Sequence, residues 1–402
     1  MTSITDGVAE LRSRLLKRFE RGEFYGTCIE PPGMFPLIVP VPRQVVAADF
    51  RRDYAMARKD NRAWIDAAAA HDGVRTVQKI IGTRLHSDQD VVTGLEFDSI
   101  DALARFLGAK AKKDLATFRQ SLAEAASADP GLRDLLLADP LLAFEAGGHW
   151  MRLVSMAGWL KRRPNPCCFL REVDLPGIHT KYIEKRRSLS RAVIDHLAPE
   201  CIADVSETGV TDGGFERRYG FRVPEFLIRL RTLDRSLAVA GRYTDLTVTV
   251  SDLAAANPGA TIVIAVENLK CFLALPDVPG AIAIMGSGCA VTVLERVLWL
   301  GGIRLLYWGD MDRDGFRILA SLRKRFPHTE SILMDRSTLL ASLEFCGDDD
   351  GSLIESLLLL TPEEEATFQH LSNLAPPRKL RLEQERIPFT LVRQAIQRAV
   401  LD

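Results

Sequence analysis

The clearest pattern in the sequence lies between Ile303 and Phe326, which reads IRLLYWGDMDRDGFRILASLRKRF. It opens with an apolar run of the kind that a buried parallel strand shows, and Gly309 ends this run. Apolar residues then recur at helical spacing up to Arg323–Arg325, three cations that suit the C-terminal end of a helix dipole. Asp310 and Asp312 therefore lie where a strand leads into a helix, which is where open α/β sheets bind ligands.

The D-x-D-x-D-G run from Asp310 to Gly315 has three interpretations. Residues two apart on extended backbone point the same way, so Asp310 and Asp312 could both face one cation. A calcium loop would need a bidentate Glu at its twelfth position, which is Ser321 here, so this interpretation fails. A polar turn without any ligand also explains the motif when it is taken alone.

The composition limits the class of protein. The 402 residues suffice for two or three domains, and 47% hydrophobic with 26% charged residues is ordinary for soluble globular protein. The net charge of −1 gives the whole molecule no attraction to nucleic acid, so any basic surface must be local. Seven scattered cysteines without a C-x-x-C pair signal neither disulfides nor zinc. The charged, amphipathic N-terminus is not a secretory signal, and no apolar run reaches the ~18 residues of a membrane span, so we expect a cytoplasmic protein.

Residues 1–150 are expected to form a separate, mostly helical unit. Apolar residues from Val8 to Phe19 make a helical stripe, and the proline-rich segment Pro31–Pro42 suggests extended, edge-like structure. Further helical patterns cover residues 45–70, 100–126 and 131–146. Nothing in this unit resembles a catalytic constellation, so we expect it to contact a partner or a polymer.

The next segment is basic. Residues 150–235 hold 16 Lys and Arg against 11 Asp and Glu. A helix with Thr180 as its N-cap carries cations on its exposed side, and a strand pattern over residues 226–231 follows a second basic strand and a turn at Val223-Pro224. A basic helix followed by a basic hairpin is what a winged-helix module offers DNA, although a basic but inert surface also fits. The candidate DNA-contacting residues are Lys181, Lys185, Arg186, Arg187, Arg217, Arg218, Arg229 and Arg231.

From Tyr243 onward, strands alternate with helices. The expected strands cover residues 246–250, 260–266, 281–285, 303–308 and 331–334. Because such alternation implies parallel crossovers, Glu267, the Gly286–Gly288 turn and the Asp310/Asp312 pair should share the carboxyl edge of one sheet. A Glu with a D-x-D at one edge is a hard-oxygen site that suits Mg²⁺ or Mn²⁺.

These residues carry a family resemblance. The Glu267, glycine-turn and Asp310-x-Asp312 pattern resembles the Toprim domain of topoisomerases, primases and related nucleases. Over roughly residues 150–390 the chain is similar to the nuclease subunit of Wadjet plasmid-defence systems, JetD. The matching segments, in order, are REVDLPGIHTKYIE, RLRTLD, VENLKCFLALP, IMGSG, YWGDMDRDGFRIL, SILMDRSTLLA and RLEQERI.

The resemblance implies an α/β multidomain chain. Residues 1–150 would form a helical N-terminal arm that binds a partner, residues 151–240 a winged-helix CAP-like DNA-binding domain, and residues 241–402 a Toprim nuclease domain with a parallel sheet. It also implies a homodimer that works with a condensin-like SMC complex and cuts closed circular plasmid DNA into double-strand breaks. Glu267, Asp310 and Asp312 would be the catalytic and metal-binding residues for Mg²⁺ or Mn²⁺, with Asp314 as a reserve ligand or outer group.

The type IIB topoisomerase relatives attack DNA with a tyrosine, which this chain is not expected to do. Tyr182 shares its helical register with apolar neighbours and is expected to pack, while Tyr219 follows Arg217 and Arg218 without the flanking pattern and stays a candidate. Without a nucleophilic tyrosine, the remaining chemistry is hydrolysis by metal-activated water.

Three alternatives remain open: an aspartyl-phosphate phosphatase, a catalytically silent DNA-binding adaptor, and a topoisomerase-like transesterase. The phosphatase would need neither Glu267 nor the basic segment, and three intact carboxylates argue against the adaptor. The roles of Glu383 and Glu385, the preferred metal, the cut pattern and the restraint on activity are not set by the sequence.

Overall fold

The computed structural model describes residues 4–82, 87–286, 293–348, 357–372 and 380–401. The chain divides into two compact units, Met1–Val223 and Pro224–Asp402, each with its own hydrophobic core. Among the described residues, no helix combines the length and the apolar character needed to cross a membrane.

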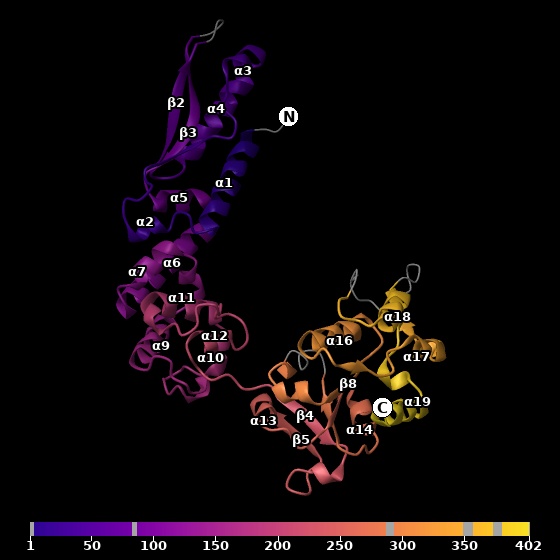
Figure 1. Ribbon diagram of the computed structural model, residues 1–402. Helices are drawn as coiled ribbons and strands as arrows, with labels where there is room; N and C mark the ends of the chain where they lie inside the picture. Colours follow the sequence, from indigo (N-terminus) through magenta and orange to yellow (C-terminus); the bar gives the residue numbers. More distant parts are fainter. Residues whose placement is uncertain (1–3, 83–86, 287–292, 349–356, 373–379, 402) are drawn as a thin grey trace. The chain divides into compact units, whose positions relative to one another are not determined.

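The first unit begins with helices around a small sheet (Figure 1). The strands β1 (Leu37–Pro40), β3 (Gln89–Phe97) and β2 (Val74–Ile81) pair antiparallel in that order. The nearby helices are α1 (Ile4–Glu20), α2 (Gly26–Ile29), α3 (Ala47–Arg52) and α4 (Tyr54–Ala69). The edge strand β1 lies in the proline-rich segment, where extended structure was predicted, whereas the β2–β3 pair was not foreseen.

Helices make up the rest of the first unit. They are α5 (Ile100–Leu107), α6 (Ala109–Ala128), α7 (Leu132–Ala138), α8 (Leu142–Ala146), α9 (Trp150–Arg162), α10 (Thr180–Glu184), α11 (Arg187–Leu197) and α12 (Gly214–Arg218), with short 3-10 turns at Leu170–Glu172 and Pro199–Cys201. Trp150 in α9 shows why they pack: its ring is buried and its indole N–H donates to the Ser121 hydroxyl at 2.9 Å. Ser121 in turn donates to the carbonyl of Ala143, so α6, α8 and α9 share one satisfied polar cluster.

The second unit is built on a six-stranded mixed sheet with the order β5-β4-β7-β6-β8-β9. Its strands are β4 (Leu227–Thr232), β5 (Asp245–Thr249), β6 (Ile262–Val266), β7 (Ala281–Met285), β8 (Arg304–Trp308) and β9 (Glu330–Ser331). The last four are parallel neighbours, while β4 runs antiparallel to both β5 and β7. The predicted α/β class is confirmed, but the sheet is mixed rather than wholly parallel.

This unit also contains one small two-stranded ribbon, and helices surround its main sheet (Figure 1). They are α13 (Val250–Ala255), α14 (Leu269–Ala274), α16 (Arg313–Arg325), α17 (Arg336–Ala341), α18 (Pro362–Ser372) and α19 (Phe389–Leu401), with 3-10 turns at Arg235–Leu237, Leu298–Gly302, Leu343–Phe345 and Gln384–Arg386. The ribbon pairs β10 (Gly347–Asp348) with β11 (Leu380–Arg381) antiparallel. Strand β6 lies in the middle of the sheet and is buried along its whole length, as its continuous apolar run predicts.

The prediction of a basic hairpin around Val223-Pro224 is wrong. The segment before Val223-Pro224, where a basic strand was expected, contains the helix α12 instead, and the strand pattern over residues 226–231 corresponds to β4 of the second unit. Ile228 and Leu230 on one face of β4 are buried in the core of that unit. An isolated two-stranded ribbon could not bury this face, so the strand joins the larger sheet instead.

Candidate active site

The carboxyl ends of β6 and β8 lie side by side. These strands pair in parallel with Val266 opposite Trp308, so Glu267 directly after β6 and Asp310 two residues after the end of β8 emerge at the same edge of the sheet. Strand β7 flanks β6 on the other side, and the amide of Gly286 donates to the carbonyl of Val266 at 2.9 Å. The placement of these three strand ends agrees with the sequence analysis; Ser287 and Gly288 of the glycine turn lie outside the described residues.

Glu267 is held by a buried tyrosine. The hydroxyl of Tyr307, a fully buried residue of β8, donates to the Glu267 carboxylate and lies 3.2 Å from the carbonyl oxygen of Gly315. Burial, helped by the charges of Asp310 and Asp312 and opposed by the Tyr307 hydrogen bond, raises the pKa of Glu267 to about 7. The charges of the two aspartates therefore disfavour the charged form of Glu267, and a cation beside Glu267 would favour it.

The two aspartates are oriented by backbone amides. Asp312 caps α16, because its Oδ1 accepts the Gly315 amide at 2.8 Å. Asp310 accepts the Gln384 amide on Oδ1 at 2.8 Å and the Arg381 Nη2 on Oδ2 at 2.9 Å. The Nε of Arg381 also lies 3.2 Å from Oδ2 of Asp312, so one guanidinium contacts both aspartates of the D-x-D.

Two glycines let the loops approach one another. A Cβ at Gly309 would lie nearer than 3.0 Å to the Tyr307 hydroxyl and the Glu267 carboxylate, and a Cβ at Gly315 would collide with the carbonyl of Asp310. Moving the Tyr307 or Glu267 side chain would break the hydrogen bond between them, and moving the Asp310 carbonyl would disrupt the turn into α16. The glycines of the W-G-D-x-D-x-D-G pattern therefore have a steric reason.

Gln384 joins the two strand ends. Its side chain is almost completely buried. The side-chain Nε2 donates to the backbone carbonyl of Trp308, and Oε1 accepts a hydrogen bond from the backbone amide of Asn268 at 2.8 Å. Together with its backbone bond to Asp310, Gln384 ties the loop after β6 to the loop after β8. Sequence reasoning missed both Gln384 and Arg381. The only signal was the late RLEQERI segment, in which the two glutamates drew the attention.

Those glutamates have different surroundings. Glu383 lies 3.2 Å from Arg386 and 3.9 Å from Arg381, measured between Oε2 and Nε of Arg386 and between Oε1 and Nε of Arg381. Glu385 is exposed, accepts the Asn268 side-chain amide at 3.4 Å and pairs with Lys270 at the same distance.

The side chains at this edge offer the type of ligand atom that a hard divalent cation prefers. Glu267, Asp310 and Asp312 offer carboxylate oxygens, the ligands that Mg²⁺ and Mn²⁺ prefer, and the Arg381 guanidinium shows that positive charge is accommodated between the aspartates. In this conformation the described His, Cys, Asp and Glu side chains form no group of three or more set to hold an ion. Asp314 is exposed in the first turn of α16 and pairs with Arg317 at 2.9 Å.

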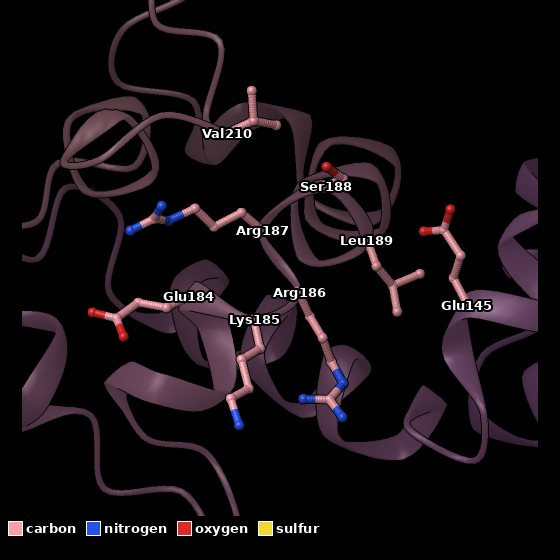
Figure 2. Close-up of a pocket in the computed structure, with 8 residues that line it drawn as sticks. All are labelled: Glu145, Glu184, Lys185, Arg186, Arg187, Ser188, Leu189 and Val210. Carbon is pink, nitrogen blue, oxygen red and sulfur yellow. The ribbon is translucent and has the colours of Figure 1, made fainter.

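The predicted DNA-contacting cations fall into two groups. Lys185 and Arg186 lie at the turn between α10 and α11, beside a pocket of about 590 Å³ (Figure 2), and Lys181 is exposed on α10. Arg186 stacks over the Tyr182 ring with its Cζ 4.9 Å from the centroid, whereas Arg187 pairs with Asp212 at 2.6 Å.

The second group, like Arg187, is engaged in contacts within the protein. Arg217 pairs with Glu207, Arg218 with Asp195, and Arg229 with Asp245, while Arg231 donates to the backbone carbonyls of Phe272, Leu273 and Leu275. Arg229 and Arg231 belong to β4 of the sheet rather than to a basic hairpin.

Both candidate tyrosines are buried. Tyr182 is 5% exposed and packs against Arg186 and His149, which confirms its predicted packing role. Tyr219 is fully buried and donates to Oδ1 of Asp195 at 2.8 Å. Burial and the Asp195 carboxylate raise the pKa of Tyr219 far above its ordinary value, which opposes formation of a phenolate nucleophile.

Two family models match this chain. Residues 220–396 match the family described as "Wadjet protein JetD, C-terminal". Residues 8–195 match the family described as "Uncharacterized protein conserved in bacteria N-term (DUF3322)". The chain belongs to the Wadjet JetD family. No curated protein matches it.

The JetD match covers the whole carboxylate site. Glu267, Asp310, Asp312 and the late segment Arg381–Arg386 all lie within residues 220–396. The turn between α10 and α11 lies in the other matched range. In this JetD-family chain, the site and the exposed cations therefore fall in two separately matched parts.

Replacing Gln384 by Leu should destabilise this JetD-family chain. The Asn268 amide and the Trp308 carbonyl would lose their partners in a buried place, at a cost of about 1–3 kcal/mol for each unsatisfied group. Urea unfolding should report the loss, and hydrogen exchange should show faster exchange of the Asn268 amide.

The exposed neighbour provides the control. Glu385→Gln removes a surface ion pair worth at most about 1 kcal/mol, so its unfolding free energy should stay near that of the wild type. Equal stability of the Gln384→Leu and Glu385→Gln proteins would contradict the role of Gln384 in joining the loops.

Proposed function

We propose that this chain is the nuclease subunit of a Wadjet anti-plasmid system and that it hydrolyses closed circular plasmid DNA into double-strand breaks. One observation carries the proposal: parallel pairing of β6 with β8 puts Glu267, Asp310 and Asp312 at one sheet edge in a JetD-family chain. Three carboxylates at one edge form a costly arrangement that a folded domain has no structural need for, and it suits phosphoryl-transfer chemistry.

The three carboxylates would hold one or two Mg²⁺ or Mn²⁺ ions, with Asp314 in reserve or in an outer position. Such ions, when bound, supply an activated water and offset the negative charge on the phosphate and leaving oxygens. The chain's own contribution is orientation. The Tyr307 hydroxyl orients Glu267, and the backbone amide of Gln384 orients Asp310. The backbone amide of Gly315, at the N-terminus of α16, orients Asp312.

The burial of both candidate tyrosines favours hydrolysis over transesterification. A transesterase needs a tyrosine hydroxyl that can reach the scissile phosphate. Tyr219 is buried with its hydroxyl on Asp195, and Tyr182 is buried beneath Arg186. The silent-adaptor alternative gains no support either, since each of the three carboxylates keeps hydrogen-bonded partners that orient it.

The proposed layout follows the family resemblance. Residues 1–150 would be an arm that docks on a condensin-like SMC complex, and α10 and α11 would belong to a winged-helix part that contacts DNA. The sheet of the second unit would be the Toprim domain. A homodimer with one site in each protomer reaches both strands of a duplex, which accounts for double-strand breaks.

Discrimination between plasmid and chromosome would come from the partner. Contacts to phosphates carry no sequence information, so a nuclease without base-reading side chains cannot choose its target locally. A complex that senses the size or topology of DNA would make the choice.

Changing the carboxylates to amides should abolish the function. Glu267→Gln, Asp310→Asn and Asp312→Asn keep the acceptors for Tyr307, Gln384 and Gly315, so the fold should persist. Mn²⁺-dependent cleavage of supercoiled plasmid, and plasmid restriction in cells carrying the complete system, should fall about 100-fold or more, as when transition-state charge stabilisation is removed.

Glu330→Gln is the matched control for those variants. It changes an exposed carboxylate on the edge strand β9 that pairs with Arg304, and it should keep wild-type restriction. Wild-type cleavage by the Asp312→Asn protein would remove Asp312 from the site.

No covalent protein–DNA adduct should form during cleavage. Denaturing the reaction midway and probing the DNA ends for attached protein should yield free ends, because water is the proposed nucleophile. An adduct that disappears in Tyr219→Phe or Tyr182→Phe would make the protein a transesterase.

Charge reversal at the turn between α10 and α11 should weaken DNA binding. Lys185→Glu with Arg186→Glu should lower the affinity for duplex DNA and reduce the log–log salt slope by about 0.9 for each lost phosphate contact. Titrations at several salt concentrations measure both quantities.

Arg62→Glu is a suitable comparison because Arg62 is an exposed cation on α4 that pairs with Asp66. Its salt slope should equal that of the wild type. An unchanged slope in the Lys185/Arg186 variant would show that this turn faces away from DNA.

A further inference from the structure

Arg381 lies among the carboxylates of the site. Its Nη2 donates to Oδ2 of Asp310 at 2.9 Å, and its Nε lies 3.2 Å from Oδ2 of Asp312 and 3.9 Å from Oε1 of Glu383. Both aspartates are largely buried, with side chains 18% and 11% exposed. The guanidinium therefore offsets their charge at the place where burial makes unpaired charge most costly.

The backbone holds this arginine in place. Next to it, Leu382 and Met311 exchange two backbone hydrogen bonds, at 2.9 and 3.1 Å, so the chain after β11 is joined to the middle residue of the D-x-D. On its other side, Arg381 pairs with Gly347 in the β10–β11 ribbon. The Nε of Arg381 is buried and makes no hydrogen bond to any described residue, so its contact with Asp312 is an ion pair only. The contact with the aspartates is thus built into the fold rather than made by a loose surface side chain.

The guanidinium and a hard cation would need the same oxygens. Both Oδ2 atoms of the D-x-D face Arg381 in this structure. Arginine cannot escape the conflict by losing its proton, because a guanidinium stays charged in proteins. Only movement of the side chain relieves it, and the 42% exposure of that side chain leaves it a route toward solvent.

We propose that Arg381 is an internal counter-ion that competes with the divalent metal for Asp310 and Asp312, and so restrains the site until its side chain is displaced. The proposal rests on the proposed function, since it concerns how that metal site is loaded. It gives the late RLEQERI segment a role that neither of its glutamates explains.

Metal binding without DNA tests the proposal. Free Mn²⁺ is measured by electron paramagnetic resonance during titration of the full-length protein and of Arg381→Gln. Removing one fixed positive charge from beside the ion should lower the dissociation constant for Mn²⁺ about tenfold or more. An unchanged or weaker affinity in Arg381→Gln would overturn the proposal, as would the absence of Mn²⁺ binding in both proteins.

Two further variants separate charge from packing. Arg386→Gln removes another cation from the same segment. The Arg386 side chain pairs with Glu383 and donates to the carbonyl of Phe345 but contacts neither aspartate. Its Mn²⁺ affinity should match the wild type within about threefold, and so should that of Arg381→Lys, which keeps the charge. A gain of similar size in Arg386→Gln or in Arg381→Lys would contradict competition by the Arg381 charge, and circular dichroism confirms that each variant is folded.

Cleavage assays keep the two proposals apart. If the wild type cuts plasmid with Mn²⁺ but Arg381→Gln gains no affinity, only the counter-ion role fails. If Arg381→Gln binds Mn²⁺ more tightly but neither protein cuts DNA within the complete system, the counter-ion role stands and the nuclease function fails.

Discussion

Parallel pairing of β6 with β8 is the constraint on which the rest of the site depends. Val266 lies opposite Trp308, so the residues that follow each strand emerge at the same edge. That register brings Glu267 to the D-x-D although about forty residues separate them in the chain. Gln384 then bridges the two loops from a third segment, with bonds to Asn268, Trp308 and Asp310.

Keeping three carboxylates together has an electrostatic cost that the surrounding residues offset. The raised pKa of Glu267 records that cost, since burial and two neighbouring aspartates all disfavour its charge. Tyr307, the Gly315 amide and Arg381 supply donors to the three side chains. A segment near the C-terminal end of the sequence is therefore as much a part of the site as the D-x-D itself.

Fewer cations of residues 150–235 are available to a partner than the sequence suggests, because several of them are paired within the protein. Arg187, Arg217 and Arg218 pair with acidic residues of the same unit, which lowers the charge that they present to a partner. Lys185 and Arg186 at the turn between α10 and α11 are where positive charge gathers beside a pocket (Figure 2). A surplus counted along the chain overstates the surface that can attract phosphates.

The sequence by itself determined the buried strands of the second sheet, the strand-to-helix turn that carries Asp310 and Asp312, and the shared edge with Glu267. Each follows from local periodicity together with the handedness of parallel crossovers. Only the tertiary structure decided that β4 joins this sheet, that β2 pairs with β3, and that Arg381 and Gln384 reach the site. An alternating strand pattern states which face is apolar but not which partner will bury it. A hydrogen bond between residues 116 positions apart, as from Asn268 to Gln384, leaves no period in the sequence at all.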